Sequence, residues 1–217
     1  MSPPPIPSPV PAKKQWDFRQ GGGVDGFIEE PLRNGGLFRG WIVNLYLVGY
    51  RCTGKSSVGR LLAEAMAWTF VDMDHELVTE SGMPIEEMVD SRGWKYFREH
   101  EGNLLQRLSQ ATKQVIATGG GVVTVPENIA IMRGSGKVVW LHASPATIAA
   151  RMEADRNTAG QRPPLHGNDS VVEIEEVLAE RLPLYDEAMH LQVETDSLTA
   201  EEVTESIVRW LKALSSE

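Results

Sequence analysis

From residue 41 onward, the chain alternates between two kinds of hydrophobic pattern. Five short apolar runs are rich in Val, Ile and Leu, and they read NLYLVG, TFVDMD, QVIAT, KVVWLHA and LQVETD. Runs of this length and composition predict buried strands. Between them, apolar residues recur every three or four positions, which is the spacing of one face of a helix. Strands separated by helices predict an α/β fold, with a five-stranded parallel sheet and helices on both faces.

Two of the expected helices begin at clear start signals. Ser144 followed by Pro145 is typical of an N-cap and a first-turn proline. Thr199 and Glu202 have the spacing of a capping box, in which each side chain bonds the backbone N–H of the other residue. Both signals indicate that a helix follows directly.

The first 40 residues differ from the rest of the chain. They begin MSPPPIPSPVPAKK and continue through RQGGGVDG, with neither helical nor strand periodicity. This composition predicts a disordered, Pro/Gly-rich extension (residues 1–40) ahead of one domain (residues 41–217). The extension lacks the apolar core of a signal peptide and the Arg-rich amphipathic character of a transit peptide.

Composition and charge narrow the function classes. A net charge of −9 argues against a nucleic-acid partner, since such surfaces are basic. No apolar run approaches the roughly 18 residues of a membrane span, which argues against a membrane partner. The single cysteine, Cys52, cannot form an intramolecular disulfide, and it fits a reducing compartment. We expect a cytoplasmic monomer.

The clearest chemical signal is the stretch GYRCTGKSS at residues 49–57. It matches G-x-x-x-x-G-K-[ST], and it lies between a predicted strand and a predicted helix, as a phosphate-binding loop requires. In the P-loop NTPase fold that this motif predicts, loop N–H groups and the helix N-terminus bind phosphates. Lys55 would reach the β- and γ-phosphates of ATP, and the Ser56 hydroxyl would hold Mg²⁺. The residues expected to contact ATP in this loop are Arg51, Cys52, Thr53, Gly54, Lys55, Ser56 and Ser57.

Polar residues and glycines mark two further strand ends. Asp72 and Asp74 alternate at the end of the second strand, so both carboxylates are expected to face one crevice. One could help to hold Mg²⁺ and the other could act as the base for an acceptor hydroxyl. Three glycines at residues 119–121 end the third strand, where a ligand could come close to bare backbone. Alternatively, Asp72 and Asp74 could be a pair of solvated acids, and the glycines could form a plain flexible turn.

Two arginines and a long polar segment complete the candidate chemistry. Arg98 lies in a predicted helix, and Arg181 lies shortly before a Pro-Leu-Tyr sequence. Guanidinium groups bind carboxylates in a planar fork, although either arginine could instead form a surface ion pair. Residues 154–169 form a polar segment between two helices. We expect a mobile lid there that brings Arg156 and Arg162 over the nucleotide.

The ordered set of motifs resembles the shikimate kinase family, over residues 44–212. The matching stretches are GxxxTGKS at 49–56, DxD at 72–74, FRxxE at 97–101, GGG at 119–121, RPPL at 162–165 and RxPLY at 181–185. The resemblance implies transfer of the γ-phosphoryl group of ATP to the 3-hydroxyl of shikimate, with Mg²⁺, on the route to aromatic amino acids.

The resemblance also implies a role for each matching residue. Lys55, Asp74 and Arg162 would be catalytic, and Arg162 would also contact the ATP phosphates. Ser56 and Asp72 would serve Mg²⁺. Shikimate would be bound by Asp74, Arg98, Gly119, Gly120, Gly121 and Arg181. There are two departures from the family pattern: Cys52 stands where a small residue is usual, and DSLT after the last strand lacks the arginine that many members place near the adenine.

Three other functions fit part of the pattern. A kinase of the same fold could act on gluconate or on a nucleoside monophosphate, which the DxD, GGG and arginine set disfavours. A GTP-dependent switch is suggested by DSRG at residues 90–93, but that stretch follows a helical run and no NKxD is present. A nucleotide-binding interaction module without catalysis would not need Lys55, Asp72 and Asp74 together.

Overall fold

A computed structural model of the chain describes residues 44–156 and 171–215. They form a parallel five-stranded sheet in the order β2-β3-β1-β4-β5. The predicted α/β fold with five parallel strands is therefore confirmed. The strands are β1 (Asn44–Val48), β2 (Thr69–Asp72), β3 (Gln114–Ala117), β4 (Gly136–His142) and β5 (Leu191–Glu194).

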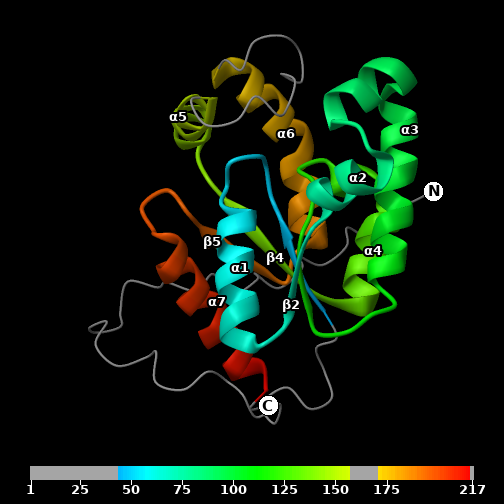
Figure 1. Ribbon diagram of the computed structural model, residues 1–217. Helices are drawn as coiled ribbons and strands as arrows, with labels where there is room; N and C mark the ends of the chain where they lie inside the picture. Colours follow the sequence, from blue (N-terminus) through cyan, green and yellow to red (C-terminus); the bar gives the residue numbers. More distant parts are fainter. Residues whose placement is uncertain (1–43, 157–170, 216–217) are drawn as a thin grey trace, which may run out of the picture.

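Helices cover both faces of the sheet (Figure 1). Helices α1 (Lys55–Met66) and α7 (Ala200–Leu214) pack together on one face. Helices α3 (Ile85–Leu108), α4 (Pro126–Ser135) and α6 (Val171–Ala188) lie on the other face, and α4 contacts both of its neighbours. The remaining elements are α2 (Met73–Ser81), α5 (Pro145–Arg156) and a 3₁₀ turn, η1 (Val122–Thr124).

Each face of the sheet has its own buried core, and β1 contributes to both. Leu45 and Leu47 pack under α1 and α7, whereas Tyr46 and Val48 pack under the helices of the opposite face. Successive strand residues point to opposite faces, and all five residues of β1 are buried. This explains why the strands read as continuous apolar runs in the sequence rather than as alternating ones.

The helix start signals form as predicted. The Thr199 hydroxyl accepts a hydrogen bond from the Glu202 N–H at 3.2 Å, and the Glu202 carboxylate accepts one from the Thr199 N–H at 2.7 Å. The Ser144 hydroxyl accepts from the Thr147 N–H at 3.3 Å, at the start of α5. The DSRG stretch at residues 90–93 lies inside α3 rather than after a strand, so it does not form a GTPase switch motif.

Two predicted features fall outside the described residues. The Pro/Gly-rich extension is one, and most of the predicted lid, with Arg162, is the other. Within the described ranges, no helix is both long enough and apolar enough to cross a bilayer.

Candidate active site

The loop after β1 has the backbone that a phosphate-binding loop requires. Gly49 has φ of 143° and Gly54 has φ of 92°, both in the region that disfavours side chains. A Cβ atom on Gly49 would also collide with the carbonyl oxygen of Leu141 on β4. Cys52 adopts φ of 60° and is half-buried within the loop. The loop therefore turns directly into the N-terminus of α1.

Lys55, the first residue of α1, folds its ammonium group back over this loop. Its Nζ donates to the carbonyl oxygens of Gly49 at 2.9 Å and Tyr50 at 2.6 Å. The Thr53 hydroxyl donates to the same Tyr50 carbonyl at 2.8 Å. A buried ammonium is thereby placed inside the ring of loop amides, where a phosphate chain would lie.

The predicted metal residues, Ser56 and Asp72, lie in direct contact. The Ser56 hydroxyl donates to Asp72 Oδ2 at 2.6 Å. The other oxygen, Oδ1, accepts from the N–H groups of Asp74 at 3.2 Å and His75 at 3.4 Å, so Asp72 also caps α2. Across the described ranges, no group of three or more His, Cys, Asp or Glu side chains could hold a metal. A hydroxyl and one carboxylate instead fit Mg²⁺, which takes few protein ligands and keeps phosphate and water oxygens.

Asp74 reaches the site by a different route from the one expected. The strand ends at Asp72, and α2 begins at Met73, so strand alternation does not relate the two carboxylates. The expectation that both lie on one strand is wrong, because the Asp72 side chain caps the helix that starts there. Asp74 lies in the first turn of α2 and still lines the pocket described next.

The three glycines after β3 lie where other groups come close to the backbone. A Cβ on Gly119 would collide with Glu101 Oε1 and would lie 3.2 Å from Asp74 Oδ1. A Cβ on Gly121 would overlap the Arg98 guanidinium. The Gly120 carbonyl accepts from the Tyr185 hydroxyl at 2.5 Å and from Arg181 Nη1 at 3.3 Å. Gly119 and Gly121 leave room for the side chains of Glu101 and Arg98, so the glycines do more than form a flexible turn.

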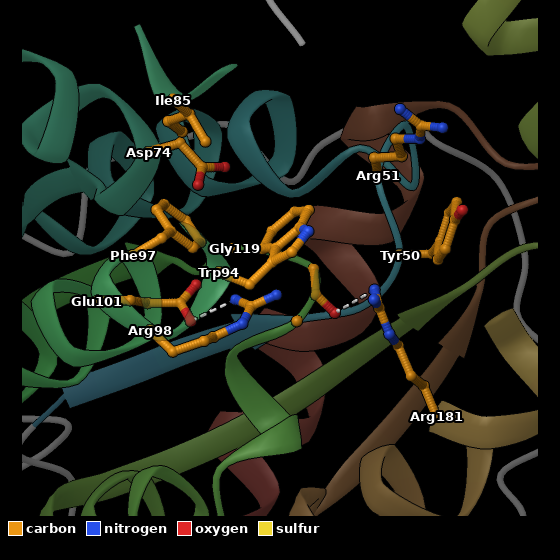
Figure 2. A pocket seen from close by; sticks show the side chains of 12 residues that line it. Tyr50, Arg51, Asp74, Ile85, Trp94, Phe97, Arg98, Glu101, Gly119 and Arg181 are labelled. Carbon is orange, nitrogen blue, oxygen red and sulfur yellow. Dashed lines mark hydrogen bonds and ion pairs between the residues drawn. The ribbon is translucent and has the colours of Figure 1, made fainter. Parts of the chain in front are cut away.

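These segments surround one pocket beside the phosphate-binding loop (Figure 2). Its lining comes from five parts of the chain, far apart in sequence. The lining residues are Tyr50, Arg51, Asp74, Ile85, Trp94, Phe97, Arg98, Glu101, Gly119, Gly120, Gly121 and Arg181. The predicted acceptor-binding residues are therefore brought together in the described structure.

Arg98 and Arg181 are held in different ways. Arg98 Nη1 lies 2.5 Å from Glu101 Oε2, and Glu101 has no exposed surface. Burial raises the pKa of the Glu101 carboxyl, and the positive charge of Arg98 opposes that shift. Oε1 of Glu101 has no hydrogen-bond partner among the described residues. Arg181 approaches from α6 and bonds the Gly120 carbonyl.

Comparison with known proteins assigns the family. The shikimate kinase family model matches residues 51–212, which is most of the chain. The chain belongs to the shikimate kinase family. Shikimate kinase 2 of Yersinia pestis (strain Pestoides F) is 41% identical over 166 residues, covering 75% of this chain and 94% of that protein. Shikimate kinase 2 of Photorhabdus laumondii is 43% identical over 141 residues, covering 65% of this chain and 80% of that protein.

Solved structures agree with this assignment. Shikimate kinase from Acinetobacter baumannii in complex with shikimate has a TM-score of 0.74 at 32% identity, covering 79% of this chain and 94% of that one. Shikimate kinase from Aquifex aeolicus has a TM-score of 0.63 at 28% identity, with coverage of 79% and 98%.

The structure places other side chains at this shikimate kinase site that the sequence did not single out. Tyr185 is fully buried beneath Gly120 and stacks on Trp140 with ring centres 5.5 Å apart. Burial raises the pKa of the Tyr185 hydroxyl, which keeps it a hydrogen-bond donor. Tyr185 belongs to the RxPLY stretch, so its position in that motif was the available signal.

Arg151 of α5 is another such residue. Its guanidinium donates to the Thr195 carbonyl at 2.5 Å and hydroxyl at 3.1 Å, and to the Cys52 carbonyl at 3.4 Å. It therefore ties the phosphate-binding loop to the turn after β5. No local pattern around Arg151 marks this role, because both partners are distant in sequence.

Proposed function

We propose that this protein transfers the γ-phosphoryl group of ATP to the 3-hydroxyl of shikimate, giving shikimate 3-phosphate and ADP. One observation carries the proposal. Arg98, Arg181, Asp74 and a glycine backbone line a single pocket that opens beside a phosphate-binding loop. Shikimate offers one carboxylate and a ring of hydroxyls, which these groups suit. Family membership and the likeness to a solved shikimate kinase support the same reaction.

On the nucleotide side, the loop amides of residues 51–57 bind the phosphate chain. Lys55 leaves the carbonyls of Gly49 and Tyr50 and turns its ammonium to the β- and γ-phosphates. Its charge then offsets the charge that builds on the γ-oxygens in a loose transition state. Positioning dominates such a reaction, because the protein forms no covalent bond to the phosphorus.

On the acceptor side, Arg98 and Arg181 bind the shikimate carboxylate from two directions. Asp74 accepts a hydrogen bond from the 3-hydroxyl, and the glycine backbone at residues 119–121 borders the ring. As the hydroxyl oxygen bonds to the γ-phosphorus, its proton passes to the Asp74 carboxylate. The bond from the γ-phosphorus to the bridging oxygen breaks, and ADP leaves with that oxygen.

Ser56 and Asp72 would hold Mg²⁺, directly or through its water shell. Bound there, the ion would neutralise charge on the β- and γ-phosphate oxygens. Their contact leaves the carboxylate oxygen and the hydroxyl side by side, facing the loop.

Arg162, outside the described residues, is proposed to contact the ATP phosphates from the lid. The monomeric state and the cytoplasmic location stay predictions.

A coupled assay of ADP release tests the proposal. The acceptor panel should contain shikimate, quinate, gluconate and two nucleoside monophosphates. We expect shikimate to give by far the highest kcat/KM. A higher value for gluconate would assign the protein to the alternative acceptor class, since gluconate also carries a carboxylate and hydroxyls. No turnover above ATP hydrolysis with any acceptor would favour a non-catalytic nucleotide-binding module.

A further inference from the structure

The indole of Trp94 lies at the rim of the acceptor pocket. In the described part of the chain, four large apolar side chains are clearly exposed, and Trp94 is one of them, with 41% of its surface accessible. Of these four, only Trp94 lines this pocket. A single exposed aromatic residue is common on protein surfaces and needs no explanation by itself. Trp94 stands apart because of what it contacts.

Trp94 stacks with the arginine that the proposed function assigns to the substrate carboxylate. The Arg98 Cζ atom lies 5.4 Å from the centre of the indole, within the range of a cation–π interaction. Phe97 meets the same indole edge-on, with ring centres 5.9 Å apart and planes at 83°. Figure 2 shows the Trp94 ring beside the Arg98 guanidinium, within the pocket lining.

The other sides of the Arg98 guanidinium are also defined. The buried Glu101 carboxylate bonds Nη1, and the absent side chain of Gly121 leaves the space that the guanidinium fills. Phe97 lies beneath it, with its ring centre 5.1 Å from Cζ. Trp94 completes this arrangement on the side nearest to solvent. A guanidinium held in this way loses little freedom when it binds a carboxylate.

The backbone before Trp94 supports its placement. Gly93 adopts φ of 81° and ψ of 164°, which breaks α3 and starts a new helical segment at Trp94. That conformation is almost restricted to glycine. No atom lies within 4 Å of a Cβ built on Gly93, so the glycine serves the backbone turn and does not make room for a neighbour. Within the new segment, Trp94 and Arg98 are four residues apart and so share one face.

We propose that Trp94 is a positioning residue for the acceptor site. Its indole face holds the Arg98 guanidinium in the orientation that receives the shikimate carboxylate, and it shields that ion pair from water. The inference rests on the proposed function, because it concerns the same carboxylate. It assigns part of the acceptor affinity to a side chain outside the family motifs quoted above.

The first test is Trp94→Leu, which keeps an apolar side chain and removes the aromatic face. Because Trp94 is partly exposed, the variant should fold with a Tm close to that of the wild type. We expect the KM for shikimate to rise roughly 5-fold, as loss of a partly exposed cation–π contact predicts, while the KM for ATP stays unchanged. Trp94→Phe, which keeps an aromatic face, should recover most of the affinity.

Tyr96→Leu is the matched control. Tyr96 is on the same helix and also has an arginine over its ring, with Arg92 Cζ at 5.3 Å, but neither residue lines the pocket. Its replacement should leave both KM values at the wild-type level. An equal rise in the KM for shikimate with Tyr96→Leu would mean that general loosening of α3, and not the stack on Arg98, causes the effect.

A double-mutant cycle with Arg98→Ala decides the mechanism. Shikimate affinity is measured by calorimetry as well as by turnover, so that very slow variants remain measurable. If Trp94 acts through Arg98, Trp94→Leu should add almost no penalty in the Arg98→Ala background. A full 5-fold penalty there, or wild-type affinity in the single Trp94→Leu variant, would overturn the inference. Failure of the proposed function is a separate outcome, since the wild-type protein itself would then neither bind nor phosphorylate shikimate.

Discussion

In the proposed function, Asp74 is the carboxylate that accepts the proton of the reacting hydroxyl. Asp74→Asn keeps the shape and removes the base, so kcat for shikimate should fall by roughly 100-fold or more. ATP affinity, measured by calorimetry, should change little, because the nucleotide is proposed to bind the loop after β1 and not Asp74. Wild-type turnover by this variant would remove Asp74 from the mechanism.

Glu101 gives the site a measurable pH dependence of stability. Burial raises the pKa of this carboxyl above its usual value of 4.5, so the folded state holds the proton to a higher pH than the unfolded state does. The stability that this contributes is fully present below the unfolded pKa and is lost as the pH rises through the folded pKa. Glu101→Gln cannot titrate. The wild-type free energy of unfolding, minus that of the variant, should therefore fall as the pH rises above 4.5.

Urea unfolding across pH 4 to 8 would measure this difference. The matched control is Glu99→Gln, an exposed position on the same helix. A pH-independent difference for Glu101→Gln would show that the pKa of the Glu101 carboxyl is the same in the folded and unfolded states.

Arg98 and Arg181 make a joint prediction about the acceptor. Removing either guanidinium should cost about 2–5 kcal/mol of transition-state binding, or 30-fold to several thousand-fold in kcat/KM for shikimate. Replacing the shikimate carboxylate by a neutral amide should impose a similar penalty on the wild-type protein, but little further penalty on Arg98→Ala. Equal turnover of acid and amide by the wild type would rule out a carboxylate clamp.

At the scale of elements, the sequence predicted what local chemistry determines. The backbone form of the phosphate-binding loop was predictable, because Gly49, Gly54 and Lys55 lie within one strand–turn–helix unit. The helix caps were predictable for the same reason. Asp74 was assigned to the right pocket with the wrong local structure, since the capping role of Asp72 depends on where β2 ends.

The individual contacts between distant segments could not be predicted from the sequence. Nothing in the sequence near Gly121 indicates that the lack of a side chain there leaves room for Arg98 of α3. The link from Arg151 to Thr195 and Cys52 joins three separate elements. Such contacts follow from the strand order and the helix packing, which local periodicity does not specify.

The break in α3 leads to a prediction about an element. Gly93→Ala should lower the free energy of unfolding by about 1–3 kcal/mol, because alanine disfavours that backbone conformation. It should also raise the KM for shikimate, since the helical segment that carries Trp94 and Arg98 would start differently. Urea unfolding and steady-state kinetics measure the two effects.

Gly82→Ala is the control for this variant. Gly82 ends α2 at φ of 69° with no atom near its Cβ position, and it lies outside the pocket lining. We expect it to reduce stability without changing the KM for shikimate. A KM effect of equal size in both variants would mean that lost stability alone explains the result for Gly93.

At the scale of the whole molecule, the strand order brings the phosphate-binding loop and the acceptor pocket together. The central strand β1 ends in the phosphate-binding loop. Asp74 and the three glycines follow β2 and β3, whereas Arg181 comes from α6, which contacts β4. Helix α5, which follows β4, and the turn after β5 are joined to the loop through Arg151. Ligands of such sheets bind at the carboxyl ends of the strands, where these segments converge.

Lys55 links nucleotide binding to global stability. At 100 times its Kd, ATP should stabilise the wild-type fold by about 2.7 kcal/mol, seen as a higher Tm. Lys55→Met should fold, show little of this protection and be nearly inactive with every acceptor. Full protection by ATP in Lys55→Met would mean that the ammonium does not contact the phosphates.

The glycine tip of β3 also bears on inhibitor resistance. Any side chain at residue 119 or 121 would displace Glu101 or Arg98 from the position it occupies. A substitution there that excluded an inhibitor would therefore disturb the groups proposed to bind the natural acceptor. A competitive inhibitor that contacts this backbone should select few escape mutations at those two positions. Resistance should arise instead at the rim, where replacement of Trp94 is expected to raise the KM for shikimate only about 5-fold.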